Sequence, residues 1–313
     1  MSRGGYPTEG GTSAVYIKTV LCCLILLSTS LTGVFPEEQR DFPLSIRDVL
    51  GRPVTLHTPP QRIVSLSPGV TEILFAIGAG DQVLGVTEYC NYPPEAASRT
   101  KVGGFSGITV NIETIARLKS DMVIISAFMH GRLIPLLERL SIPFFAVEPK
   151  NFKEVYQTIE TLGILTGNVR GAQEVIERMQ EKIRQVAERR GNRESPRVFW
   201  ELSDEPLISA GSKTFISEAI RLGGGKNIFE DLNEEWPMVS TEQVVRRKPD
   251  WIIAGDDHGK IIEPRALASR PGWGMIPAVR QNHIALVNAD TLYRYGPRLA
   301  DAVVSIADIL YGK

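Results

Sequence analysis

The sequence predicts an α/β protein with two lobes joined by one long helix. Short apolar segments alternate with amphipathic segments of helical periodicity in both halves of the chain. A proline-free, charge-rich stretch with helical spacing separates the halves at residues 151–190. A sequence segment of the first half also recurs in the second half. We therefore expect lobes at residues 34–150 and 191–313, with the helix between them.

The first half contains short apolar segments that are rich in β-branched residues, as is typical of strands buried on both faces. Helical patterns lie between these segments, and such alternation predicts a parallel sheet covered by helices. We expect strands at residues 62–67, 83–87, 122–126 and 144–147, and helices at 71–77, 112–118 and 133–140.

Residues 151–190 carry apolar residues at helical spacing, such as Val155, Ile159 and Leu162. We expect a long helix here, bent near Gly167. At 1.5 Å per residue, a helix covering most of this stretch reaches roughly 45–60 Å. That length is sufficient to pass from one lobe to the other.

The second half resumes the alternation, with strands expected at residues 197–202, 207–209, 251–254 and 284–287. Residues 110–125 and 239–254 are identical at six of sixteen positions without a gap. Each segment is predicted to contain a helix cap (Asn111 or Ser240), a short helix, a Lys-x-Asp turn and a buried strand. This repeat favours duplicated lobes, although βα units share such patterns in general.

Residues 1–33 form a candidate export segment. Lys18 precedes the apolar run Thr19-Val-Leu-Cys-Cys-Leu-Ile-Leu-Leu27, and small residues follow it. This order is typical of a secretory signal peptide, and a retained membrane anchor is the alternative. Cys22 and Cys23 lie inside the apolar run, which does not favour lipidation. We expect an exported protein, periplasmic or at the cell surface, in which Cys90 is the one remaining cysteine.

Composition and motifs exclude several functions. A net charge of −1 gives no support for nucleic-acid binding. The sequence lacks a Gly-x-Ser-x-Gly elbow, a phosphate-binding loop and a His-Glu-x-x-His motif, so we do not expect an enzyme. Metal ligation by the protein and a resident cofactor are also not expected, because the histidines lack ligand spacing. The histidines are His57, His130, His258 and His283, and we interpret Asp256-Asp257-His258 as a solvated loop.

Four separated motifs carry a resemblance to a known family. They are Arg62-Ile-Val-Ser-Leu-Ser-Pro-Gly-Val-Thr-Glu-Ile-Leu-Phe-Ala-Ile-Gly78, Asn111-Ile-Glu113 with Lys119-x-Asp121, Leu222-Gly-Gly-Gly-Lys-Asn-Ile-Phe229, and Trp236-Pro-Met-Val-Ser-x-Glu242. In this order they resemble the periplasmic binding proteins for vitamin B12, haem and ferric siderophores, from about Ile46 to the C-terminus. The resemblance implies two Rossmann-like lobes bridged by one long helix. It also implies delivery of a small-molecule ligand to the permease of an ABC importer, which works with a cytoplasmic ATPase.

Within that family, the chain is most similar to the vitamin B12 receptors, and this likeness implies a set of ligand contacts. Phe105 replaces a tryptophan of those receptors, and Lys226 replaces an acidic residue. Core packing is the alternative role for the aromatic residues, and a mutual ion pair is the alternative for Asp290 and Arg294. The implied ligand-binding residues are Tyr89, Phe105, Trp236, Asp290 and Arg294.

Glu113 and Glu242 occupy matching positions in the repeated segments. The resemblance implies that one acidic residue on each lobe docks with arginines of a two-fold permease. Stabilisation by the helix dipole is the alternative role. We expect a monomer that binds a cobalamin-type corrinoid, with haem or a ferric siderophore as the next choice. A sensor or adhesion module on the same fold is a further alternative.

Overall fold

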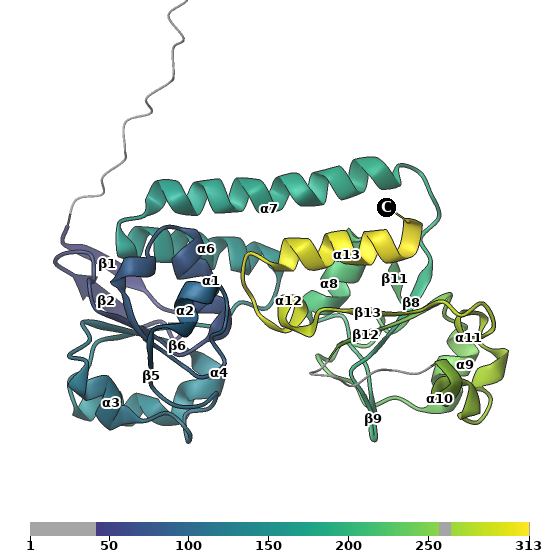
Figure 1. Cartoon of the computed structure of the whole chain (residues 1–313), viewed down its shortest axis with the longest axis horizontal. Coiled ribbons are helices and arrows are strands. Elements are labelled where there is room, and N and C mark those ends of the chain that lie inside the picture. Colours follow the sequence, from purple (N-terminus) through teal and green to yellow (C-terminus); the bar gives the residue numbers. More distant parts are fainter. Residues whose placement is uncertain (1–41, 257–263, 313) are drawn as a thin grey trace, which may run out of the picture. The chain divides into compact units, whose positions relative to one another are not determined.

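The computed structural model describes residues 42–256 and 264–312, which belong to one compact unit (Figure 1). The export segment at residues 1–33 lies outside the described residues, as do Asp257 and His258. In the described part of the chain, no helix combines the length and the apolarity needed to cross a membrane.

The first lobe contains a parallel five-stranded sheet with the order β5-β4-β3-β6-β7. Every residue of β3, β6 and β7 is buried, as expected for strands covered on both faces. An antiparallel hairpin, β1–β2, precedes this sheet and was not expected from the sequence. The strands are β1 (Leu44–Arg47), β2 (Pro53–Leu56), β3 (Ile63–Ser65), β4 (Val83–Val86), β5 (Thr100–Lys101), β6 (Met122–Ser126) and β7 (Phe144–Val147).

Helices connect these strands, and the longest of them, α1, begins with Pro68 at its first position, where a missing N–H costs nothing. The elements are α1 (Pro68–Ala76), η1 (Gly80–Gln82), α2 (Pro94–Ala97), α3 (Ile112–Arg117), α4 (Ala127–His130), η2 (Gly131–Leu133) and α5 (Ile134–Arg139).

The connection between the lobes contains two helices, α6 (Phe152–Thr166) and α7 (Val169–Arg190). The expectation of one helix over most of residues 151–190 is wrong, because Gly167 has a φ of 75° and ends α6. The two helices pack against each other (Figure 1). The 22 residues of α7 extend about 33 Å. This helix contacts α1 of the first lobe and α8 and α13 of the second, so it is the helix that joins them.

The second lobe contains a parallel four-stranded sheet with the order β11-β8-β12-β13. The expected strand at residues 207–209 does not join this sheet. Its residues Leu207 and Ile208 pair instead with β9 in a small antiparallel hairpin. The strands are β8 (Arg197–Glu201), β9 (Ser203–Asp204), β10 (Leu207–Ile208), β11 (Lys226–Asn227), β12 (Trp251–Gly255) and β13 (Ile284–Val287).

The helices of the second lobe cover its sheet, and the last helix, α13, packs against both α7 and α8. They are α8 (Phe215–Leu222), α9 (Thr241–Arg247), α10 (Pro264–Ser269), η3 (Trp273–Met275), α11 (Pro277–Arg280), α12 (Ala289–Tyr293) and α13 (Leu299–Tyr311).

The repeated sequence segments have the same local structure in both lobes. Lys119 and Lys248 both adopt a left-handed backbone with a φ of 48°. The aspartate two residues later then accepts a backbone N–H from the start of the lobe's first sheet strand. Asp121 accepts from Arg62 N at 2.9 Å, and Asp250 accepts from Arg197 N at 2.8 Å. The matching geometry supports the interpretation of duplicated lobes.

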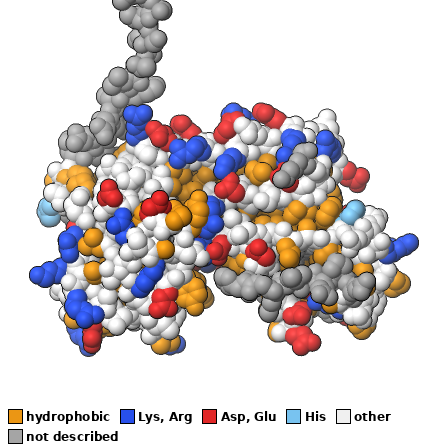
Figure 2. Space-filling view, in the orientation of Figure 1, with side chains coloured by type: hydrophobic (Ala, Val, Ile, Leu, Met, Phe, Trp, Pro, Cys, Tyr) orange, Lys and Arg blue, Asp and Glu red, His pale blue; other side chains and the backbone are white. Residues whose placement is uncertain are grey.

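One apolar cluster extends through both lobes and the α6–α7 pair, and it includes Val155 and Val175. Two smaller clusters fill the other face of each sheet. The face of the molecule seen in Figure 2 carries acidic and basic side chains interspersed, as expected from a net charge of −1. The core therefore holds the lobes through α6 and α7, while the polar loops of both remain available for a site.

Candidate functional site

A cavity of about 600 Å³ lies between the lobes. Its first-lobe wall contains residues that directly follow β3, β6 and β7, where parallel strands end and ligand sites are common. Its second-lobe wall contains segments around Thr214, Trp236 and Arg294. All five residues that the sequence comparison implied as ligand contacts line this one cavity, although they are spread over 200 positions of the chain.

Three of these five residues present aromatic surface to the cavity. Tyr89 is 52% exposed, Phe105 43% and Trp236 40%, so none of them is a core residue. The rings of Tyr89 and Phe105 meet edge to face, with centroids 5.7 Å apart. Large aromatic surfaces left in contact with water inside a cleft are typical of ligand sites. The cavity therefore has apolar faces from both lobes.

Asp290 and Arg294 form the mutual ion pair that was the alternative to ligand contact, with 2.6 Å between Arg294 Nη2 and Asp290 Oδ1. The pair is not on the open surface, because the side chain of Arg294 is only 10% exposed. Arg294 also donates to Asn91 Oδ1 at 2.6 Å and lies 3.5 Å from Glu72 Oε1. Arg294 thus connects the lobes and lines the cavity at the same time.

A buried ion pair fixes the lobes beside the cavity. Glu72 of α1 accepts two hydrogen bonds from Arg298 of the second lobe, at 2.9 and 2.5 Å. Burial raises the pKa of the Glu72 carboxyl, and the charges of Arg298 and Arg294 oppose that shift. Nearby, Ser67 donates to the hydroxyl of Tyr295 at 2.9 Å. A Cβ added at Gly69 would lie 3.0 Å from the backbone nitrogen of Tyr295, so glycine permits this close approach.

Sequence reasoning missed Phe128, which lines the cavity and is 79% exposed. Its backbone N–H donates to Glu148 Oε2 at 3.1 Å, and Ser126 Oγ donates to the same oxygen at 2.6 Å. The sequence feature that could have identified Phe128 is its position two residues after the buried strand β6, because residues that follow parallel strands often line ligand sites. Other lining residues were also missed, among them Glu148, Lys213, Phe215 and Tyr293.

Glu113 and Glu242 both occupy the second position of a capped helix and are exposed. Asn111 caps α3, and Ser240 forms a full capping box with Gln243 at α9. A hydrogen bond from Ser240 lowers the pKa of the Glu242 carboxyl. Figure 1 shows α3 and α9 on the side of their lobes opposite α7. The two carboxylates are therefore presented in equivalent settings, one per lobe.

Among residues 42–256 and 264–312, no three His, Cys, Asp or Glu side chains are grouped so that they could hold a metal ion. Asp256, the described member of the acidic–histidine cluster, accepts the backbone N–H of Ala289 at 2.7 Å. Lys226 lies outside the cavity and pairs with Glu230 at 3.6 Å. The replacement of an acidic residue of the vitamin B12 receptors by Lys226 therefore does not change the lining of the cleft.

Two parallel α/β lobes, a helical connection and an aromatic cleft define a two-lobed solute-binding protein. The chain belongs to the periplasmic binding protein family, whose pattern matches residues 63–291.

Several proteins resemble the chain over most of its length. An uncharacterized ABC transporter substrate-binding lipoprotein of Bacillus subtilis is 31% identical over 93% of this chain and 96% of its own. A vitamin B12-binding protein of Vibrio cholerae is also 31% identical, and its crystal structure superposes on 80% of this chain and 97% of its own with a TM-score of 0.66. A periplasmic haem-binding protein of Roseiflexus is 25% identical, covering 80% and 98%, with a TM-score of 0.70.

From these relationships, the chain is the extracytoplasmic substrate-binding component of an ABC transporter. The family is one of solute-binding proteins rather than enzymes. A small-molecule ligand and a membrane permease with its ATPase are the partners that follow from this role.

Proposed function

We propose that this protein captures a corrinoid of the vitamin B12 type between its lobes and delivers it to a membrane permease. The observation that carries the proposal is the set of exposed aromatic side chains that converge on one cleft from both lobes. Tyr89, Phe105 and Phe128 come from the first lobe and Trp236 from the second. Vitamin B12-binding relatives support the choice of ligand.

A corrin is a broad, partly apolar disc with amide groups at its edge, and the cleft suits that shape. Aromatic surfaces on opposite lobes can cover the two faces of a flat ring. The carboxylates of Asp290 and Glu148 can accept hydrogen bonds from amide groups at the edge. The ion pair with Arg294 holds Asp290 in place, so little conformational entropy is lost when a ligand binds.

Haem is the second candidate, and one feature of the cleft favours it. Tyr89 is half-exposed in the cavity, and tyrosine is one of the side chains that ligate haem iron. The haem-binding relative from Roseiflexus supports this alternative. A ferric siderophore would use the same aromatic surfaces.

The proposal includes export by the N-terminal segment, with or without later cleavage, and action as a monomer. Docking to the permease uses Glu113 on one lobe and Glu242 on the other. Their equivalent positions at capped helices suit a permease with two-fold symmetry.

Titration of the purified protein with cyanocobalamin, haemin and a ferric hydroxamate tests the ligand, with calorimetry as the readout. We expect sub-micromolar binding of cyanocobalamin and about a 10- to 100-fold loss of affinity in Trp236→Ala, as for a central aromatic anchor. Met275→Ala is the control, because Met275 is 70% exposed on the same lobe and does not line the cleft. If the protein bound haemin tightly and did not bind cyanocobalamin, haem rather than a corrinoid would be the ligand.

Charge reversal tests the docking residues. We expect Glu113→Arg and Glu242→Arg each to lower uptake in proteoliposomes that contain the cognate permease and ATPase, because each removes one attraction to basic residues. Cyanocobalamin affinity should stay unchanged, since neither side chain lines the cleft. Equal loss of uptake in the control Glu174→Arg, on the exposed side of α7, would argue against docking at these positions.

A further inference from the structure

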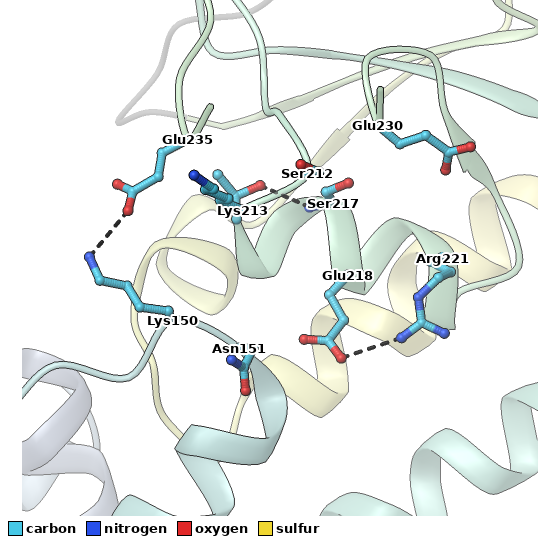
Figure 3. A pocket seen from close by; sticks show the side chains of 10 residues that line it. Lys150, Asn151, Ser212, Lys213, Ser217, Glu218, Arg221, Glu230 and Glu235 are labelled. Carbon is cyan, nitrogen blue, oxygen red and sulfur yellow. Dashed lines mark hydrogen bonds and ion pairs between the residues drawn. The ribbon is translucent and has the colours of Figure 1, made fainter. Parts of the chain in front are cut away.

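A second cavity of about 450 Å³ adjoins the cleft (Figure 3). Four residues line both cavities: Lys150, Lys213, Thr214 and Glu235. Lys150 precedes α6, whereas Glu235 belongs to the second lobe, and their side chains form an ion pair at 3.3 Å. The two cavities therefore adjoin at this pair, but their linings differ. The cleft is aromatic, whereas the second cavity is lined mainly by charged and hydroxyl-bearing side chains.

Ion pairs satisfy almost every charge in the second cavity. Arg221 pairs with Glu218 at 3.3 Å, and Glu230 pairs with Lys226 just outside the cavity at 3.6 Å. Lys150 is paired with Glu235 and also lies 3.9 Å from Glu148, which lines the cleft. Of the charged side chains that line this cavity, Lys213 alone makes no ion pair with a described residue. Figure 3 shows Lys213 on the same side of the pocket as the Lys150–Glu235 pair, and all three residues line both cavities.

We propose that the second cavity binds an anionic substituent of the molecule held in the cleft, with Lys213 as its counter-ion. Lys213, which has no ion-pair partner among the described residues, attracts a negative group and disfavours a positive one. The lysine ammonium is a compact point charge with rotatable donors, so it can donate hydrogen bonds to a phosphate or to a carboxylate. Ser212 and Thr214 also line this cavity, but their hydroxyl groups already donate to the backbone oxygens of Leu232 and Gly211, so Lys213 is the group that holds the anion.

This inference rests on the proposed function, which supplies two sources of such an anion. In cobalamins, the nucleotide loop carries a phosphodiester at the edge of the corrin. In haem, the propionate groups carry carboxylates at the edge of the porphyrin. In either case the ring would occupy the aromatic cleft, and the anionic arm would extend past the Lys150–Glu235 pair.

The test compares ligands that share a ring but differ in the anion. The purified chain is titrated with cyanocobalamin and with dicyanocobinamide, which lacks the nucleotide loop and its phosphate. We expect Lys213→Met to weaken cyanocobalamin binding about three- to tenfold and to leave cobinamide binding unchanged. Haemin and its dimethyl ester provide the corresponding pair for carboxylates. Raising the salt concentration should weaken cyanocobalamin binding to the wild type more than to Lys213→Met.

Lys153→Met is the matched control, because Lys153 is an exposed lysine that lines neither cavity. Equal weakening of both corrinoids by Lys213→Met, or no effect on cyanocobalamin and haemin, would overturn the subsite and leave the proposed function intact. Failure of the wild type to bind either ring would instead overturn the proposed function itself.

Discussion

His130 is a buried residue that lines the cleft and makes the stability of the fold depend on pH. It is 1% exposed, and its Nδ1 accepts the backbone N–H of Ser126 at 3.1 Å. That hydrogen bond requires an unprotonated Nδ1, so the folded protein holds the neutral imidazole. Burial lowers the pKa of His130 from its ordinary value of 6.5. Protonation must therefore weaken the fold.

We predict that the free energy of unfolding falls as the pH falls below 6.5. In that range the unfolded chain binds a proton at position 130 that the folded chain does not, so stability is lost with a slope of at most about 1.4 kcal/mol per pH unit. The variant His130→Asn keeps an acceptor near the Nδ1 position and should lack this contribution. Urea denaturation at several pH values measures it. His57→Asn, at an exposed histidine, should keep the wild-type slope.

At the scale of single residues, the family resemblance pointed to aromatic residues in glycine-flanked or proline-flanked loops. Phe105 and Trp236 are such residues, and both line the cleft. Phe128 was missed because it directly follows an apolar strand, where a phenylalanine is indistinguishable from a core residue. Glu72 was missed because its partner Arg298 is distant in the sequence, and only the folded chain brings them together.

The short helices α3 and α9 are equivalent elements of the two lobes, and each depends on its N-cap. Asn111 Oδ1 accepts the N–H of Thr114 at 2.9 Å, and Ser240 Oγ accepts that of Gln243 at 3.2 Å. An N-cap hydrogen bond satisfies a backbone donor that has no partner within the helix. The caps therefore position the acidic residue that follows on each lobe.

We predict that Asn111→Ala and Ser240→Ala each lower the free energy of unfolding by about 1 kcal/mol. The two losses should add in the double variant, because the helices belong to different lobes and share no partner. Ser240→Thr, which keeps the hydroxyl, should lose much less. Thermal and urea denaturation provide the measurement. If only one of the two alanine variants lowered the free energy of unfolding, the two helix caps would not be equivalent.

Among the elements, apolar strands were the most predictable. Residues 122–126, 144–147 and 284–287 form strands with the expected bounds, although only the first two are buried throughout. The connection between the lobes was predicted only in part. A bend was expected near Gly167, but a break into two helices was not, because the helical spacing continues through Gly167 and Asn168. Apolar periodicity describes α6 and α7 equally well, and the left-handed glycine that separates them leaves that pattern nearly intact. The hairpin β9–β10 was missed since its pairing is local and unrelated to strand burial.

On the scale of the whole molecule, the lobes are joined by more than α6 and α7. Glu72 binds Arg298 and lies near Arg294. The side chains of Glu72, Arg298 and Arg294 are 1%, 17% and 10% exposed, respectively. Removal of one partner from such a cluster leaves buried charges uncompensated. The cluster therefore makes the arrangement of the lobes depend on a few cross-lobe contacts.

We predict that Glu72→Ala lowers the free energy of unfolding by about 3–5 kcal/mol, because Arg298 loses its buried counter-ion, whereas Arg294 keeps Asp290. Calorimetry measures the loss. The control Glu174→Ala removes exposed pairs on α7 and should cost no more than about 0.5 kcal/mol. A similar effect of both changes would mean that water reaches the Glu72 cluster and screens it.

The fixed lobes have a consequence for the importer as a system. Since α7 and the Glu72–Arg298 pair hold the lobes, an empty molecule should present the proposed docking residues, Glu113 and Glu242, in the same arrangement as a loaded one. Empty molecules would then occupy the importer unproductively. Uptake would rise with the amount of binding protein only while cargo is plentiful, and excess binding protein would inhibit transport when cargo is scarce. The expression level of this component, relative to its cargo, would thus set the rate of import.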